Sequence, residues 1–223
     1  MKCFFNKQHY HVLFLLGVLP VLWMYSRHLT GVLPIVNLPI LWGFWASIIF
    51  VIIHQLKVWF VFRSELCFGF VSKLFKDKAL FLWAIIFLIF LFLRPVLLII
   101  VALASKNTLP GPIYVYQVIA LISAFPAIYT LYSVFRYFGI YRAIGGDHFE
   151  AKYRKMPLVK EGAFKYSNNA MYTFAFLILW SIALLNQSVP ALVLAAFQHS
   201  YIWIHYFTVE KPDMEKLYPK NIN

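Results

Sequence analysis

Residues 79–104 constrain this chain most strongly: they read ALFLWAIIFLIFLFLRPVLLIIVALA and contain a single charged residue, Arg94. The stretch is longer than the roughly 20 residues that an α-helix needs to cross a lipid bilayer. A backbone inside a bilayer finds no water, so it must satisfy its own polar groups, and a helix does this. The segment therefore predicts a membrane-spanning helix.

The composition of the whole chain favours a membrane setting as well. Of 223 residues, 62% are hydrophobic and 13% are charged, whereas soluble domains contain about 45–50% apolar and about 25% charged residues. So few polar side chains cannot cover a water-soluble globule. We therefore interpret the net charge of +12 as a topology signal and expect a bilayer, not a nucleic acid, as the partner.

Six apolar stretches are candidate spans: approximately 10–25, 32–53, 79–104, 113–135, 170–186 and 189–208. Basic residues gather between the second and third, between the fourth and fifth, and after the sixth. The positive-inside rule then places both termini and the loop 136–169 in the cytoplasm. We expect an all-α, polytopic transmembrane helical bundle with about six spans, or with four spans and a re-entrant terminal hairpin.

Some residues are not expected to form sites. Cys3 and Cys67 are too few for a disulfide framework or a metal cluster. His199 and His205 are six residues apart and do not share a helical stripe, so we expect no metal. Arg94 lies inside a span, and no acidic residue in any candidate span is available to pair with it.

The acidic residues divide the chain into two regions. Six of the eight follow residue 146, namely Asp147, Glu150, Glu161, Glu210, Asp213 and Glu215. We expect residues 1–135 to form a transmembrane scaffold and residues 136–223 to form a cytosol-facing region that carries the chemistry. The last two spans should form a hairpin, which would bring Asn169 and Tyr172 beside Glu210.

Three short motifs occur in order in this second region. They are Gly146-Asp147-His148-Phe149, then Ala163-Phe164 leading to Asn169-Ala170-Met171-Tyr172, and finally Glu210-Lys211-Pro212 with Tyr218 shortly after. In order and spacing they resemble the membrane methyltransferases that include phosphatidylethanolamine N-methyltransferase and isoprenylcysteine carboxyl methyltransferase. The resemblance covers about the last 85 residues, and it is closer to the phospholipid branch because Asn168-Asn169 replaces the Arg-His of the prenylcysteine branch.

The resemblance implies methyl transfer from S-adenosylmethionine to a membrane lipid, most simply to the amine headgroup of a phospholipid. It implies an integral protein of a bacterial inner membrane or endoplasmic reticulum membrane, with its active site facing the cytoplasm. Candidate proton acceptors and cofactor ligands follow from this chemistry. The proton acceptors are Asp147, His148 and Glu210; the cofactor ligands are Gly145, Gly146, Phe164, Tyr166, Asn169, Tyr172 and Glu210.

The basic cluster of Lys152, Arg154 and Lys155 could hold the lipid phosphate, or serve only topology and contact with anionic lipid. Two positions depart from the family pattern: Ala170 replaces a proline, and Lys211 replaces the second glutamate of a pair. Lys211 keeps open a non-catalytic relative, such as a scaffold or transporter. Carboxyl methylation of an isoprenylated cysteine and a sterol-reductase-like activity are the enzymatic alternatives.

Overall fold

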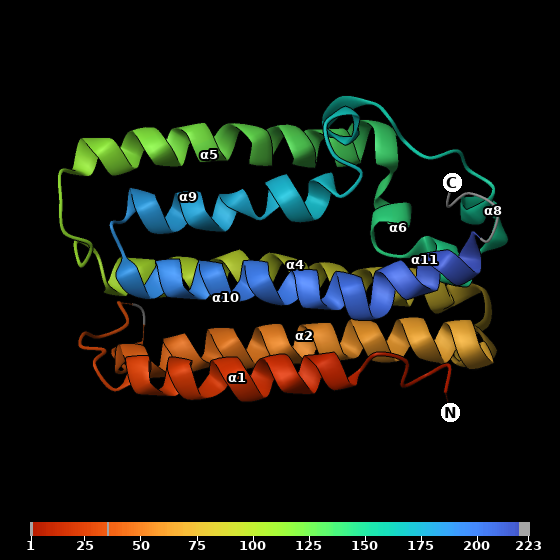
Figure 1. Ribbon diagram of the computed structural model, residues 1–223, viewed down its shortest axis with the longest axis horizontal. Coiled ribbons are helices and arrows are strands. Elements are labelled where there is room, and N and C mark those ends of the chain that lie inside the picture. Colours follow the sequence, from red (N-terminus) through yellow and green to blue (C-terminus); the bar gives the residue numbers. More distant parts are fainter. Residues whose placement is uncertain (1, 35, 219–223) are drawn as a thin grey trace.

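The computed structural model describes residues 2–34 and 36–218, and in these residues the fold is all-α (Figure 1). Four of the described helices are long and apolar enough to cross a membrane. They are α1 (His9–Ser26), α2 (Ile40–Phe68), the unit Phe70–Ala104, which includes α3 (Phe70–Phe75) and α4 (Ala79–Ala104), and the unit Ile113–Phe138, which begins with α5 (Ile113–Ser133). The all-α prediction is confirmed for these residues.

The last two predicted spans form a shorter hairpin. Its first arm combines the π-helical turn η4 (Met171–Ala175) with α9 (Leu177–Leu185), and its second arm is α10 (Val189–His205). Ser188 caps α10, because its Oγ accepts a hydrogen bond from the backbone N of Ala191 at 3.1 Å. How many times the chain crosses the membrane, and which side each terminus faces, stay predictions.

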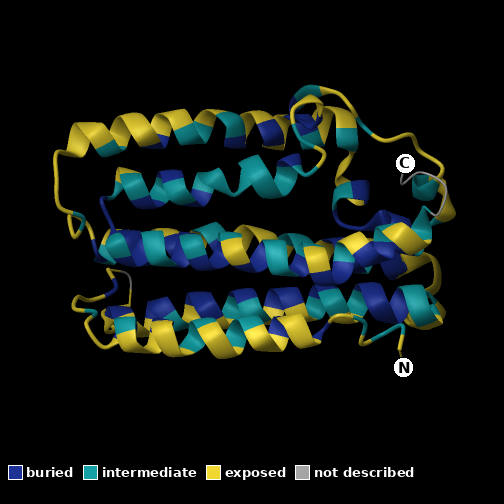
Figure 2. Ribbon diagram, viewed as in Figure 1, coloured by how far each residue is buried: buried dark blue, intermediate teal, exposed yellow. Residues whose placement is uncertain are grey.

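The helices pack side by side along one axis. In the described chain α2 packs against α4, α10 packs against both α2 and α9, and α5 lies along α9. Figure 2 shows the buried residues concentrated along α10 and α2, whereas α5 and α1 carry exposed faces. On α5 these faces are apolar, with Leu121, Ile122 and Phe125 among the most exposed. Such faces suit lipid acyl chains rather than water, as expected of an integral membrane protein.

Arg94 finds a neutral partner inside the bundle. Its Nε donates a hydrogen bond to Oε1 of Gln198 at 3.1 Å, and its guanidinium lies 5.1 Å from the ring centroid of Phe176. An amide oxygen and an aromatic face thus take the place of the acidic partner that the sequence lacks.

The sequence predicts no disulfide framework, and it does not predict that the two cysteines bond to each other. Cys3 and Cys67 are bonded, with their Cα atoms 6.2 Å apart although 64 residues separate them in the sequence. Counting cysteines cannot reveal this pair, because only the return of the N-terminal segment to the end of α2 brings the two residues together.

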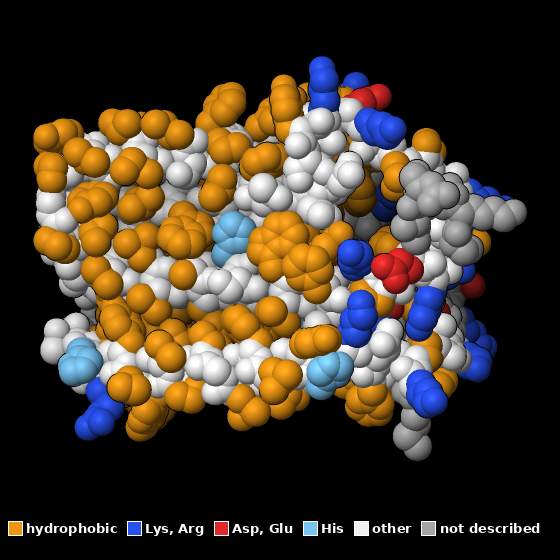
Figure 3. Space-filling model, viewed as in Figure 1, with side chains coloured by type: hydrophobic (Ala, Val, Ile, Leu, Met, Phe, Trp, Pro, Cys, Tyr) orange, Lys and Arg blue, Asp and Glu red, His pale blue; other side chains and the backbone are white. Residues whose placement is uncertain are grey.

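Charged side chains gather at one end of the bundle, on the right in Figure 3, whereas apolar side chains cover most of the rest of this face. Four short helices lie at that end: α6 (Ile140–Ala143), α7 (Gly146–Phe149), α8 (Ala151–Arg154) and α11 (Lys211–Leu217) (Figure 1). Three π-helical turns lie where long helices reach the same end: η2 (Val134–Phe138), η4 and η5 (Tyr206–Glu210). Such turns are rare and frequently mark functional sites.

Candidate active site

A buried histidine on α7 forms the centre of the charged end. His148 Nδ1 lies 3.2 Å from Oδ1 of Asp147, and its Nε2 lies 3.3 Å from Oδ2 of Asp213 on α11. The ring of Phe62 stacks on the imidazole with 4.1 Å between ring centroids. The side chain of His148 is fully buried, so the ring is fixed from two edges and one face.

Asp213 forms an ion pair with Arg63 on α2. Arg63 Nε lies 2.9 Å from Oδ1 of Asp213, and both side chains are 0% exposed. This contact is an ion pair without an aligned hydrogen bond. The other guanidinium nitrogens of Arg63 donate to the carbonyl oxygens of Cys3 at 2.8 Å and Thr208 at 3.0 Å. Asp147–His148–Asp213–Arg63, called the buried network below, therefore alternates acidic and basic groups.

The alternation sets the protonation of His148. Burial alone would lower the pKa of His148, but its hydrogen bonds to Asp147 and Asp213 raise this pKa to about 9. Burial would raise the pKa of Asp147, but the hydrogen bonds from His148 and Tyr218 outweigh it and leave this pKa below its ordinary value. At neutral pH, His148 is therefore an imidazolium between two carboxylates.

The backbone around the buried network is tightly packed. Arg154 clamps α7, because its guanidinium donates to the carbonyl oxygens of Asp147 at 2.6 Å and His148 at 2.9 Å. Gly145 has φ +86°, and a Cβ there would lie 2.2 Å from Cζ of Phe62. A Cβ on Gly146 would lie 2.5 Å from the carbonyl oxygen of Tyr141. The two glycines thus admit neighbouring protein groups, and the space beside them is filled by this chain itself.

A second polar group lies where the two arms of the hairpin end. The hydroxyl of Tyr172, on η4, donates a hydrogen bond to Oε2 of Glu210, the last residue of η5. His205 Nε2 lies 3.7 Å from Oε1 of Glu210. Burial raises the pKa of Glu210 to about 7, with the hydrogen bond from Tyr172 acting in the opposite direction. Glu210 keeps 23% of its side chain exposed, whereas the side chains of Arg63 and Asp213 are 0% exposed.

Two further aromatic rings pack against Tyr172, the residue that donates to Glu210. The ring centroids of Tyr172 and Tyr206 are 5.5 Å apart, those of Trp203 and Tyr206 are 5.7 Å apart, and those of Tyr172 and Trp203 are 6.0 Å apart. We call Tyr172, Trp203, Tyr206 and Glu210 the aromatic–carboxylate group. Aromatic faces beside a carboxylate attract organic cations.

The other predicted cofactor ligands, Phe164, Tyr166 and Asn169, have different surroundings. Phe164 is buried and stacks on Phe138, with 4.9 Å between centroids. Tyr166 is 72% exposed. Asn169 precedes Tyr172 by one turn and accepts the backbone N–H of Tyr172 with its carbonyl oxygen at 2.9 Å. The hairpin thus meets Glu210 through Tyr172.

The three basic residues assigned to a phosphate have different surroundings. Arg154 is engaged by α7, as described above. Lys152 is exposed and forms an ion pair with Glu150. Lys155 is exposed at the end of α8. Lys211, which replaces the family's second glutamate, is exposed as well, whereas the buried carboxylate of α11 is Asp213.

Arg63 and Asp213 were not among the predicted site residues. Asp213 follows Glu210 by three residues, which places both on one side of a helix, and this spacing was the available signal. Arg63 ends an apolar helix, where a basic residue ordinarily reports topology. Its pairing with a residue 150 positions later has no local signature.

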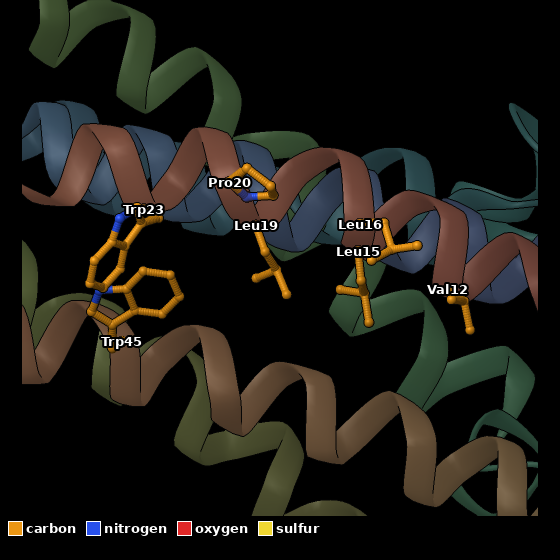
Figure 4. A pocket seen from close by; sticks show the side chains of 7 residues that line it. All are labelled: Val12, Leu15, Leu16, Leu19, Pro20, Trp23 and Trp45. Carbon is orange, nitrogen blue, oxygen red and sulfur yellow. The ribbon is translucent and has the colours of Figure 1, made fainter.

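The described chain also has an apolar groove between α1 and α2, with a volume of about 510 Å³ (Figure 4). It is lined by Val12, Leu15, Leu16, Leu19, Pro20, Trp23 and Trp45. None of these side chains belongs to the buried network or to the aromatic–carboxylate group.

Comparison with protein families identifies the later part of the chain. Residues 115–221 match the phospholipid methyltransferase family, whereas comparisons with curated proteins and with solved structures found no match. The matched region contains the aromatic–carboxylate group and all of the buried network except Arg63. The resemblance inferred from the three sequence motifs is therefore confirmed for residues 115–221, which are similar to the phospholipid methyltransferase family.

Proposed function

We propose that this protein transfers a methyl group from S-adenosylmethionine to the amine headgroup of a membrane phospholipid. The observation that carries the proposal is the aromatic–carboxylate group, in which Glu210 lies between Tyr172 and His205 at the charged end of an apolar bundle. This position suits a lipid whose acyl chains lie along the helices while its headgroup reaches the carboxylate.

The residues present fit the proposed cofactor. S-adenosylmethionine, when bound, supplies an electrophilic methyl group on a sulfonium cation and also carries an ammonium group. Glu210 can pair with a cation, and the rings of Tyr172, Trp203 and Tyr206 can face one. Both ring nitrogens of the buried His205 lack a hydrogen-bond partner in the described chain, and a bound ligand or water would satisfy them.

Of the three candidate proton acceptors, Glu210 fits the task best. The amine acceptor is largely protonated at neutral pH and must lose a proton before it can attack the methyl group. A base works best when its pKa is near the working pH, and the pKa of Glu210 is about 7. His148 already holds its proton, and the lowered pKa of Asp147 makes it a weaker base. We therefore assign proton removal to Glu210 and positioning of α7 and α11 to the buried network.

The charged end supports a headgroup-facing orientation. Exposed Lys152 and Lys155 lie on and just after α8, close in sequence to the buried network. Basic side chains at a membrane surface attract anionic lipid phosphate, and the positive-inside rule favours the cytoplasm for this end. Lys155 is the better candidate for a phosphate contact, because Glu150 already pairs with Lys152.

The experiment is a transfer assay on purified protein in vesicles, with S-adenosylmethionine labelled in its methyl group. Phosphatidylethanolamine and a farnesyl-cysteine analogue are offered separately, and products are separated by chromatography. We expect label in the phospholipid. Label in the farnesyl-cysteine ester alone would replace the proposal with carboxyl methylation. Absence of label from both acceptors, with folded protein that binds the cofactor, would contradict it. Glu215→Gln, at an exposed carboxylate of α11, is the matched control for variants of Glu210.

A further inference from the structure

The N-terminal segment, residues 3–8, lies against the end of α2 and reaches the residues next to the buried network. The carbonyl oxygen of Cys3 accepts from Arg63 at 2.8 Å, and that of Phe4 accepts from Nε1 of Trp59 at 3.2 Å. Farther along, Nε2 of Gln8 lies 3.5 Å from the carbonyl oxygen of Thr208, the same oxygen that accepts from Arg63. The segment therefore supplies one of the three oxygen contacts of this guanidinium.

The disulfide fastens this segment at the point that touches Arg63. Cys67 follows Arg63 by four residues on α2, so the two side chains lie on the same face one turn apart. The bond to Cys67 thus fixes the residue whose carbonyl oxygen holds Arg63. Both cysteines are half-buried rather than enclosed, so a small thiol reagent can reach the bond.

We propose that the Cys3–Cys67 disulfide is a redox-sensitive fastener that positions Arg63, and through it Asp213 and His148, for methyl transfer. The inference rests on the proposed function. Arg63 acts as a positioning residue, since it touches Asp213 and not the reacting groups. With the bond intact, the Cys3 carbonyl restrains the guanidinium that orients Asp213. With the bond broken, that restraint depends on noncovalent contacts, among them the packing of Phe4 and Phe5 against Trp59 and the hydrogen bonds of Phe4 and Gln8.

Breaking the bond requires a dithiol as co-reactant. The dithiol gives two electrons and two protons, the S–S bond between Cys3 and Cys67 is replaced by two thiols, and the dithiol becomes a disulfide. The cytoplasm, where the basic residues place this end of the bundle, keeps most thiols reduced. There a dithiol would open the disulfide, and the disulfide form of the same carrier would close it by the reverse exchange, taking back the two electrons and two protons.

The test compares oxidised and dithiothreitol-reduced wild-type protein with the Cys3→Ser/Cys67→Ser double variant. Mass spectrometry after alkylation counts the free thiols in each sample. We expect reduction to lower kcat about tenfold with little change in cofactor KM, since misplacing a catalytic group by about 1 Å can cost about 100-fold. The double variant should be as slow as the reduced protein and insensitive to the reagent. Arg63→Lys should also be slow, and reduction should not slow it further.

Hydrogen exchange separates this inference from the proposed function. Reduction should raise amide exchange in residues 3–8 and in α11, and this readout needs no activity. Equal kcat and equal exchange in the oxidised protein and in protein with two free thiols would overturn the inference. If wild-type protein transfers no methyl group while exchange still rises on reduction, the proposed function fails and the fastener stands as a structural link.

Discussion

The two polar groups at the charged end differ in how their charges are compensated and in how far they are exposed. In the buried network, the side chains of Arg63 and Asp213 are 0% exposed, and each charge faces an opposite one. In the aromatic–carboxylate group, Glu210 is partly exposed and its neighbour His205 has no hydrogen-bond partner in the described chain. We therefore infer a structural role for the buried network, whose charges compensate one another, and propose chemistry for the aromatic–carboxylate group, whose carboxylate is partly exposed.

The largest expected effect comes from Glu210→Gln, which tests whether the aromatic–carboxylate group carries the chemistry. The change keeps the size of the side chain but removes the base, so we expect transfer to fall by about 100-fold to 10,000-fold, with little change in thermal stability. In the wild-type protein, kcat/KM should rise with pH through about 7, because Glu210 must lose its proton to act. Both are measured by labelled-methyl assays across pH. Wild-type activity in this variant would show that Glu210 takes no part in the chemistry.

The next largest effect is expected on stability, from Asp213→Asn. The change leaves Arg63 as a buried charge without its partner, and breaking a buried ion pair in this way costs about 3–5 kcal/mol of the free energy of unfolding. Denaturant unfolding in detergent measures it. Asp77→Asn, at an exposed acidic residue, is the control and should change little. A loss no larger than that of the control would show that the buried network does not stabilise the fold.

The protonation of His148 predicts a pH dependence of stability. The pKa of His148 is about 9 in the fold, above its ordinary value of 6.5. The folded state therefore holds this proton more tightly than the unfolded state. This contribution is fully present below pH 6.5 and is lost as pH rises through about 9, amounting to at most about 3 kcal/mol. Unfolding curves at several pH values measure it. If the free energy of unfolding of His148→Asn depends on pH in the same way, other groups cause the dependence.

The smallest effect concerns packing beside the buried network, tested by Gly145→Ala. The added Cβ would meet the ring of Phe62, and the backbone there has φ +86°. Overpacking typically costs about 1–3 kcal/mol, and the left-handed backbone adds to it. Gly17→Ala, at a position with no neighbour within 4 Å of the added Cβ, is the matched control. Equal stability of the two variants would mean that Phe62 moves aside freely.

The sequence predicts most of the helices, because each apolar helix is a continuous run of residues, but the expected span 32–53 corresponds to α2, which begins at Ile40 and ends at Phe68. The apolar stretch 79–104 becomes α4 with the same bounds. The meeting of Tyr172 and Glu210 also follows from local information, since a hairpin with a short turn must bring its two ends together.

Contacts between distant segments could not be predicted in this way. The pairs Arg63–Asp213 and Cys3–Cys67 depend on how α2 lies against the C-terminal and N-terminal segments. The close approach of Phe62 to Gly145 likewise depends on tertiary packing. A glycine pair in the sequence is equally compatible with a ligand or with a neighbouring ring, and only packing distinguishes them.

The π-helical turns η4 and η5 make the aromatic–carboxylate group sensitive to chain length. Each contains one residue more than an α-helical turn needs, so deleting a single residue would restore an ordinary helix. The helix beyond the deletion would keep nearly the same direction, because the turn already holds the extra residue. Tyr172 and Glu210 both lie inside such turns, so a one-residue deletion there would disturb their hydrogen bond and leave the long helices in place.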